Sequence, residues 1–385
     1  MKGVLPLTAL LIGLFTQAGF GQEAPYRSAH YEISGGTGDA AQRIAGDLEG
    51  RFAVYTRLFR FKAQSPDLPL RVRLISDPGA YDAYVAGQLG EKREGAVYLH
   101  FRQEDRRELV VHYQAPDSWG RALPYQSFIQ YLRFFIPNPP SWIQKGFAIY
   151  FSGLSFSDTG ELGYRENLSW LERVKAMSLP PVQTILLADT AEDPELPGLD
   201  ALSWSLVSFF LNSGDEDNFR TLLECFMLLS PQAGAAENSL ALARRIEDWN
   251  GFEELDASYQ AYLDSRSTFP ELLSRGRQAY MAGDSESARS AFLEALDLQP
   301  EIHAPYYYLG LIAYENGKWE EAEWYYRQSL ELGAEQALVY YALGLNAAAA
   351  LQREKAAEYL NAAVQADPLR YREKAETLLR RLPGR

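Results

Sequence analysis

Residues 125–151 read YQSFIQYLRFFIPNPPSWIQKGFAIYF, and this stretch decides how the first half of the chain is interpreted. Apolar residues recur at helical spacing on both sides of the segment IPNPP, which contains three prolines. Because proline interrupts a helix interior, the pattern predicts two helices joined by a proline-rich elbow. We expect the first half of the chain to fold around this pair of helices, called the hub below.

The second hub helix carries a recognisable set of residues: Trp142, Ile143, Gly146, Ala148 and Tyr150. They resemble the segment W-[LI]-N-E-G-x-A-x-Y of gluzincin-type metallopeptidase-like domains, the peptidase MA-like family. In that family the preceding helix carries H-E-x-x-H, whose histidines bind zinc and whose glutamate is the general base. The resemblance implies a sheet before the hub, with an edge strand that holds extended substrate.

The zinc chemistry of that family is missing here. Gln126, Ser127 and Gln130 occupy the positions of the two histidines and the glutamate, and Lys145 occupies the position of the carboxylate ligand. Neutral amides are poor zinc ligands, serine is no general base, and an ammonium repels a dication. The resemblance therefore implies a degenerate site with no catalytic residue, no metal and no cofactor.

The other potential metal ligands are His30, His100, His112, His303 and Cys225, and no two of them lie closer than twelve residues. Neither H-x-x-x-H nor C-x-x-C spacing occurs. A metal site assembled from distant positions remains the alternative. With one cysteine there is no intramolecular disulfide.

Composition restricts the class of protein. The 385 residues are 47% hydrophobic and 13% aromatic, which indicates a globular chain long enough for two or three domains. The 37 basic and 51 acidic residues give a net charge of −14, so nucleic acid and anionic membrane surfaces are not expected as partners.

The first 21 residues have the pattern of a signal peptide. Lys2 precedes an apolar run at 4–15, and small residues follow at Ala18, Gly19 and Gly21. The run is too short to span a bilayer, and no cysteine follows it for lipid attachment. These features predict a periplasmic or secreted protein without a transmembrane anchor after cleavage.

Residues 28–265 alternate between strand and helix patterns before the hub, in the order β-α-β-α-β-β, and become mostly helical after it. The order is similar to that of the gluzincin-like domain before its metal helix. We therefore predict an α+β metallopeptidase-like domain at 28–265, with a mixed sheet and a helical half.

The last third of the chain is repetitive. Gly276, Gly310 and Gly344 are 34 residues apart, and small and bulky residues follow each glycine at the same spacing. This period resembles the tetratricopeptide (TPR) repeat. The predicted domain, 268–385, is an all-α solenoid that ends in a capping helix. The three repeats are expected at about 269–302, 303–336 and 337–370.

Such arrays present a concave groove lined by the first helix of each repeat. At the repeat spacing its lining is Arg277, Tyr280, Tyr307, Leu311, Tyr314, Tyr341 and Leu345. Tyrosines give contact area and hydrogen bonds at low entropic cost, which suits a protein or peptide ligand. The alternative is that some of them only pack between repeats. The Lys/Asn pattern of carboxylate-clamping adaptors is absent, so capture of a C-terminal carboxylate is not implied.

Together these features predict a non-catalytic interaction or scaffolding protein of the bacterial cell envelope. It would combine a metallopeptidase-like domain without zinc and a peptide-binding TPR array. The alternative is a secreted, peptidase-like hydrolase with an unrecognised site. That function would require His112 to meet Asp117 or Ser127 in the fold.

Overall fold

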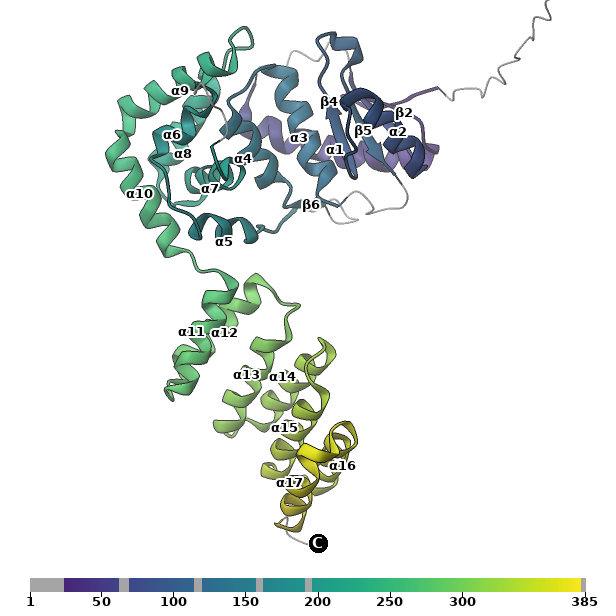
Figure 1. Ribbon diagram of the computed structural model, residues 1–385, viewed down its shortest axis with the longest axis vertical. Helices are drawn as coiled ribbons and strands as arrows, with labels where there is room; N and C mark the ends of the chain where they lie inside the picture. The colour runs from purple at the N-terminus through teal and green to yellow at the C-terminus, as the bar shows by residue number, and fades with distance from the viewer. Residues whose placement is uncertain (1–23, 62–68, 114–119, 157–161, 191–195, 382–385) are drawn as a thin grey trace, which may run out of the picture. The chain divides into compact units, whose positions relative to one another are not determined.

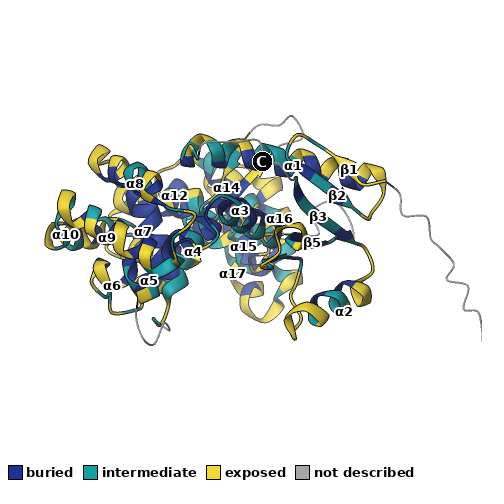
Figure 2. Cartoon of the chain, turned by 90° about the horizontal axis from the view of Figure 1, so that it is seen from above, coloured by how far each residue is buried: buried dark blue, intermediate teal, exposed yellow. Residues whose placement is uncertain are grey.

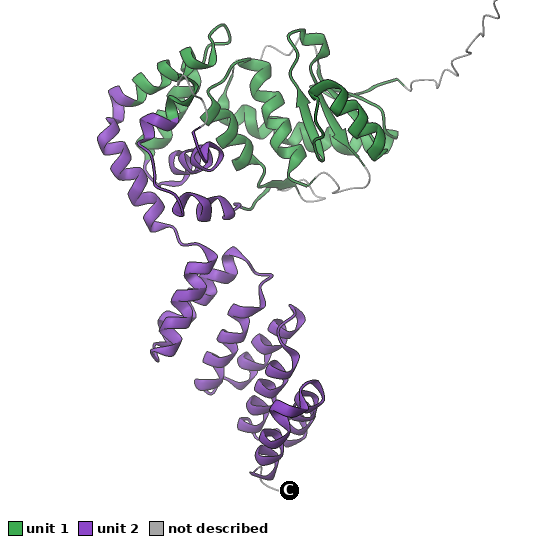
Figure 3. Ribbon diagram, viewed as in Figure 1, with its two compact units in different colours: residues 1–165, 186–194, 216–246 green, residues 166–185, 195–215, 247–385 purple. Residues whose placement is uncertain are grey.

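The computed structural model describes residues 24–61, 69–113, 120–156, 162–190 and 196–381 (Figure 1). The predicted signal peptide lies outside these residues. The chain forms two compact units (Figure 3). The first contains residues 1–165, 186–194 and 216–246, and the second contains residues 166–185, 195–215 and 247–385.

The first unit contains a mixed five-stranded sheet. Its strands are β1 (Tyr26–Arg27), β2 (Tyr31–Ser34), β3 (Leu70–Ile75), β4 (Ala96–Leu99) and β5 (Glu108–His112). They lie in the order β1-β2-β3-β5-β4. Strands β2, β3 and β5 are parallel, whereas β1 and β4 are antiparallel edge strands. A two-stranded hairpin of β6 (Leu154–Phe156) and β7 (Leu162–Tyr164) follows the hub.

The helices of this unit begin and end at residues suited to those positions. The side chain of Thr37 accepts a hydrogen bond from the backbone of Ala40 at the start of α1 (Gly38–Phe59). Asp77 does the same for α2 (Pro78–Leu89), which ends at the left-handed Gly90. The remaining elements are η1 (Glu104–Arg106), α3 (Ala122–Phe135), α4 (Ser141–Phe151), η2 (Ala188–Thr190), α8 (Glu216–Leu228) and α9 (Ala235–Asn250).

Helices α3 and α4 are the predicted hub, and the elbow between them is fixed from outside the hub. The carboxylate of Asp189 accepts hydrogen bonds from the backbone N–H and the hydroxyl of Ser141, the first residue of α4. The side-chain amide of Asn238 donates to the carbonyl of Asn138 in the elbow, at 3.0 Å. These contacts satisfy backbone groups that the prolines leave without helical partners.

An aromatic core holds α1, α3, α4 and α8 together. Phe59 of α1 packs against Phe226 of α8 with ring centroids 4.2 Å apart, and it meets Phe147 of α4 edge-on at 5.0 Å. Phe128 of α3 lies 5.2 Å from Tyr55 of α1. Burial of such side chains is the main stabilising contribution in this unit.

The second unit is all-helical. Before the repeats it contains α5 (Ser169–Lys175), α6 (Val182–Leu186), α7 (Leu199–Asn212) and α10 (Phe252–Ser265). Helix α7 is buried over nearly its whole length (Figure 2). Lys175 of α5 forms an ion pair with Glu271, whose carboxylate also caps the helix that begins the array. The array therefore has a direct contact with the helices that precede it in this unit.

The array consists of three antiparallel helix pairs and a last helix. The first helices of the pairs are α11 (Phe269–Met281), α13 (His303–Glu315) and α15 (Gln336–Ala349). Their partners are α12 (Ser285–Leu298), α14 (Trp319–Glu331) and α16 (Arg353–Ala366), and α17 (Pro368–Arg381) follows. A mixed sheet with helices followed by an all-α repeat array confirms the predicted fold class. No helix within the described ranges is long and apolar enough to cross a membrane.

Candidate functional site

The 34-residue period sets the packing inside each helix pair. A Cβ placed on Gly310 of α13 would lie 2.5 Å from the ring of Tyr326 in α14. The corresponding distances are 2.6 Å between Gly276 and Phe292, and 2.7 Å between Gly344 and Leu360. Each glycine thus lets a bulky side chain of the second helix press on the backbone of the first.

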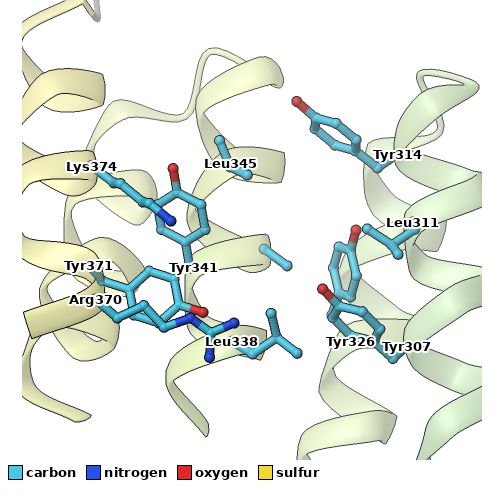
Figure 4. Close-up of a pocket in the computed structure, with 11 residues that line it drawn as sticks. Tyr307, Leu311, Tyr314, Tyr326, Leu338, Tyr341, Leu345, Arg370, Tyr371 and Lys374 are labelled. Carbon is cyan, nitrogen blue, oxygen red and sulfur yellow. The ribbon is translucent and has the colours of Figure 1, made fainter. Parts of the chain in front are cut away.

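A pocket of about 290 Å³ opens between α13, α15 and α17 (Figure 4). Its lining residues are Tyr307, Leu311, Tyr314, Tyr326, Leu338, Tyr341, Ala342, Leu345, Arg370, Tyr371 and Lys374. Figure 4 shows two facing walls, with Tyr307, Leu311, Tyr314 and Tyr326 on one and Tyr341, Leu345 and the α17 residues on the other. We call this pocket, together with the exposed first-helix face of α11, the groove.

The tyrosine rings of the pocket pack against one another in pairs. The rings of Tyr307 and Tyr326 lie 5.9 Å apart, and those of Tyr341 and Tyr371 lie 4.9 Å apart. Burial, with Tyr371 and Tyr308 nearby, raises the pKa of Tyr307 to about 12. The phenol therefore stays protonated at neutral pH and is able both to donate and to accept a hydrogen bond.

The last helix adds positive charge to this apolar pocket. Arg370 places its guanidinium 5.1 Å from the ring centroid of Tyr371 and donates to the carboxylate of Glu335 at 2.8 Å. The ammonium of Lys374 lies 5.6 Å from the same ring centroid. Both distances fit a cation–π contact. The lining thus combines tyrosines, aliphatic side chains and two cations.

Five of the seven predicted groove residues meet in this pocket: Tyr307, Leu311, Tyr314, Tyr341 and Leu345. The lining residues of each first helix lie on one face of that helix. Residues 307, 311 and 314 of α13 are spaced by four and three, and residues 338, 342 and 345 of α15 have the same spacing. Their role in binding stays a prediction.

The other two predicted residues, Arg277 and Tyr280, lie on α11 and do not line the pocket. The Arg277 guanidinium is 5.5 Å from the ring centroid of Tyr308, and the Tyr280 hydroxyl donates to Glu315 of α13. These contacts join neighbouring repeats, as the alternative interpretation of the tyrosines allows.

Sequence reasoning missed six lining residues. Tyr326 belongs to the bulky series that the repeat assigns to packing, and Leu338 and Ala342 share the helical face of Tyr341. Arg370, Tyr371 and Lys374 come from α17, which has no counterpart in the repeat. Their helical spacing places 370 and 374 on one side of the last helix, and this is the signal that could have found them.

The hub positions have structural partners. The side-chain carbonyl of Gln126 accepts a hydrogen bond from the backbone N–H of Tyr98 in β4 at 3.0 Å. Gln130, which is 1% exposed, donates to the carbonyl of Arg71 in β3 at 2.9 Å. Ser127 is fully buried and lies 3.3 Å from the Tyr55 hydroxyl of α1. Both glutamines therefore fix α3 to the sheet.

These residues do not fit a zinc ion. The two glutamine amides are engaged with the sheet backbone, Ser127 faces α1, and Lys145 is a half-buried cation on α4. Zinc requires imidazole, thiolate or carboxylate donors. In the described parts of the chain, no group of three His, Cys, Asp or Glu residues is arranged to hold a metal ion.

A partly buried polar cluster lies beside the hub. The guanidinium of Arg133 donates to the side-chain carbonyl of Gln144 at 2.6 Å, which links α3 to α4. The Tyr98 hydroxyl lies 3.4 Å from Nδ1 of His100. Burial, with Arg133 and Arg107 nearby, lowers the pKa of His100 to about 4. This imidazole is therefore neutral at physiological pH.

The hydrolase alternative needs His112 close to Ser127 or Asp117. The ring of His112 stacks on Tyr81 of α2, with centroids 5.2 Å apart, whereas Ser127 contacts α1. Tyr81 packs with Val97, Leu99 and Val110 of the sheet, so His112 and Ser127 lie on opposite faces. Asp117 lies outside the described residues. Among the described residues, His112 and Ser127 are therefore not arranged as a base and a nucleophile.

No family model matches the chain, and no curated protein matches it. Solved structures similar to it include an O-GlcNAc transferase variant from Thermobaculum terrenum, at 25% identity over 30% of this chain with a TM-score of 0.27. The CopN-Scc3 complex has 20% identity over 32% of this chain and a TM-score of 0.27. MamA from Desulfovibrio magneticus RS-1 has 22% identity over 44% and a TM-score of 0.28.

The chain spans 22% of the length of the matched transferase chain, 74% of the CopN-Scc3 chain and 86% of the MamA chain. The functional interpretation therefore rests on the groove and hub residues themselves.

Proposed function

We propose that this protein is a non-catalytic interaction or scaffolding protein of the bacterial cell envelope, which binds a protein or an extended peptide in the groove of its TPR-like array. The observation that supports this most strongly is the pocket between α13, α15 and α17, where residues from two repeats and the last helix converge. Pockets lined by apolar and aromatic side chains with few polar groups are the usual form of a binding site.

The hydrogen bonds of the hub residues in the first part of the chain support the same function. In the proposed metallopeptidase-like domain, residues 28–265, the motif positions have become structural contacts between α3 and the sheet. A working zinc site needs its ligands free to reach the metal and a general base next to it. The domain would then serve as a carrier or second docking surface for the array, residues 268–385.

The shape of the groove favours a chain-like ligand. Tyrosines and leucines lie along successive first helices, and outside the pocket Tyr280 of α11 contacts Tyr308 of α13. Tyr and Trp side chains supply large contact areas with few rotatable bonds, which keeps the entropic cost of binding low. A small molecule would use only one part of such a face.

Capture of partners from a cell-envelope extract tests this function. The full chain is immobilised, and bound proteins are compared between the natural sequence and a Tyr307→Ala/Tyr341→Ala variant. Loss of the captured proteins in the variant is expected, because truncating an anchor aromatic typically costs about 2 kcal/mol or more. A second variant, Met281→Ala/Trp324→Ala, controls for damage to the array, because its two exposed side chains belong to the array but do not line the pocket, and it should keep the captured proteins.

Helical circular dichroism must be the same for all three proteins. Equal capture by all three would contradict a role for the groove, and loss on substitution of Gln126, Gln130 or Lys145 instead would assign binding to the hub.

A further inference from the structure

The charge of the pocket differs from that of the chain around it. The whole sequence carries 51 acidic and 37 basic residues. The pocket lining nevertheless contains Arg370 and Lys374 and not one acidic residue. A cationic wall beside tyrosines and leucines is complementary to a ligand that carries a carboxylate next to an apolar group.

We propose that the pocket selects a peptide segment in which an acidic residue lies within two positions of a bulky apolar residue. This inference rests on the proposed function, because it names the ligand of the same groove. The apolar side chain fills the space between Tyr307 and Tyr341, and the carboxylate meets the cations of α17.

The two cations have different roles in this recognition. Arg370 already holds the Glu335 carboxylate with one side of its guanidinium and lies against the ring of Tyr371. Lys374 is exposed, lines the pocket, and has no carboxylate partner in the part of the chain that the structure describes. Lys374 is therefore the cation that remains available, and Arg370 extends the positive potential around it.

The size of the pocket limits what enters it. A volume of about 290 Å³ lies just below the range for ligand sites, ~300–1,000 Å³. It accommodates one or two side chains of a ligand. Because side chains alternate between the two faces of an extended segment, residues two positions apart are the ones that enter the pocket together.

The acidic group is assigned to a side chain inside a segment and not to a chain terminus. Outside the pocket, Tyr280 of α11 contacts Tyr308 of α13 with ring centroids 5.8 Å apart. A ligand that also contacts these rings must run on beyond the pocket. We therefore expect the peptide chain to continue on both sides of the acidic residue.

A peptide-display selection on the full chain tests the inference. The probe is a library of random decapeptides displayed as an internal loop, so that no terminal carboxylate is presented. Enrichment of Glu or Asp within two positions of Leu, Ile, Phe, Tyr or Trp is expected on the natural sequence. The enrichment of acidic residues should be lost on Lys374→Gln and retained on Arg372→Gln, an exposed cation of the same helix that does not line the pocket.

Selected sequences are then made as acetylated and amidated peptides for titration. Replacing the acidic residue by glutamine should weaken binding to the natural protein about threefold to fivefold at low salt, the range of a solvent-accessible ion pair. The difference should shrink at 0.5 M NaCl, because salt screens exposed charges. Lys374→Gln should remove the difference, whereas Arg372→Gln should not.

The outcomes separate the two proposals. Peptides that lose binding on Tyr307→Ala/Tyr341→Ala but show no preference for acidic residues would overturn this inference and leave the proposed function standing. Peptides that bind both the tyrosine variant and Lys374→Gln unchanged, or a selection that yields no binder, would overturn both. Binding that requires a free C-terminal carboxylate in place of the amide would overturn the assignment to an internal side chain.

Discussion

Gln126 binds the backbone of the edge strand β4. Its side-chain oxygen accepts a hydrogen bond from the backbone N–H of Tyr98, and the two atoms are 3.0 Å apart. Strand β4 pairs with β5 antiparallel, with Tyr98 opposite Leu109, and the N–H of His112 donates to the carbonyl of Gly95. Hydrogen-bonded pairs alternate along such a ladder, so the Tyr98 N–H points away from β5. At this position Gln126 fills the edge site that an added peptide strand would use.

Gln130 provides the second tie between α3 and the sheet, and its loss should be costly. We expect Gln130→Ala to lower the free energy of unfolding by about 2–3 kcal/mol, because it leaves the Arg71 carbonyl without its partner and opens a cavity in a buried region. Urea unfolding followed by circular dichroism measures this. Gln88→Ala, at an exposed position of α2, should change the same quantity by less than about 0.5 kcal/mol. Equal effects of the two substitutions would contradict a stabilising role for the hydrogen bond between Gln130 and Arg71.

Replacing a helical glycine by alanine should change stability in a direction that depends on how closely the glycine is packed. Alanine is favoured over glycine in a helix by about 1 kcal/mol, but a methyl group at Gly310 would lie 2.5 Å from the buried ring of Tyr326. We expect Gly310→Ala to destabilise the array by about 1–2 kcal/mol. Gly46→Ala in α1, where the methyl group meets no atom within 4 Å, should stabilise its unit by about 0.5–1 kcal/mol. Thermal unfolding of both variants measures the two signs, and stabilisation by both would show that the glycines are not required for close packing.

His100 gives a pH-dependent prediction. Its pKa of about 4 lies below that of an unfolded histidine, about 6.5, so the unfolded chain takes up a proton first as the pH falls. The stability linked to His100 is therefore present above pH 6.5 and is lost as the pH falls towards 4. Because the side chain is only half-buried, we expect this loss to be about 1 kcal/mol.

Unfolding free energies of the natural protein and of His100→Gln, measured between pH 7 and pH 4.5, isolate this contribution. As the pH falls, the free energy of unfolding of the natural protein should decrease more than that of His100→Gln. A difference that is constant with pH would contradict the depressed pKa.

The proposed absence of zinc chemistry predicts the metal content of the protein. The hub offers two amides, a buried hydroxyl and an ammonium at the positions where the metallopeptidase motif that it resembles has ligands and a base. Elemental analysis of purified, dialysed protein should give far less than one zinc per chain. A stable content near one zinc per chain would contradict this and would point to the alternative of ligands drawn from distant positions.

The sequence predicted those features that depend on local periodicity. The 34-residue spacing of Gly276, Gly310 and Gly344 reflects contacts inside one helix pair, so it is visible without the fold. The face of α13 that carries Tyr307 and Tyr314 follows from helical spacing in the same way. The order of strands and helices before the hub was equally readable from local pattern.

Contacts between distant segments were not predictable in this way. The bond between Gln126 and Tyr98 depends on which side of β4 faces α3, and the sequence does not specify that register. The cations Arg370 and Lys374 reach the pocket only because α17 packs against α15, and a capping helix has no repeat partner that would reveal its orientation. Arg277 and Tyr280 on α11 followed the period, but they contact α13 and do not line the pocket.

The most direct measurement for the central claim is a fluorescence anisotropy titration of one labelled peptide, obtained by selection on the full chain, against three proteins. These are the natural sequence, the groove variant Tyr307→Ala/Tyr341→Ala, and the hub variant Gln126→Ala/Lys145→Ala, each with unchanged circular dichroism. The account predicts that the groove variant binds the peptide at least about tenfold more weakly. The hub variant should bind it with the affinity of the natural protein. Full affinity in the groove variant, with loss in the hub variant, would contradict the account and would make the hub the binding surface.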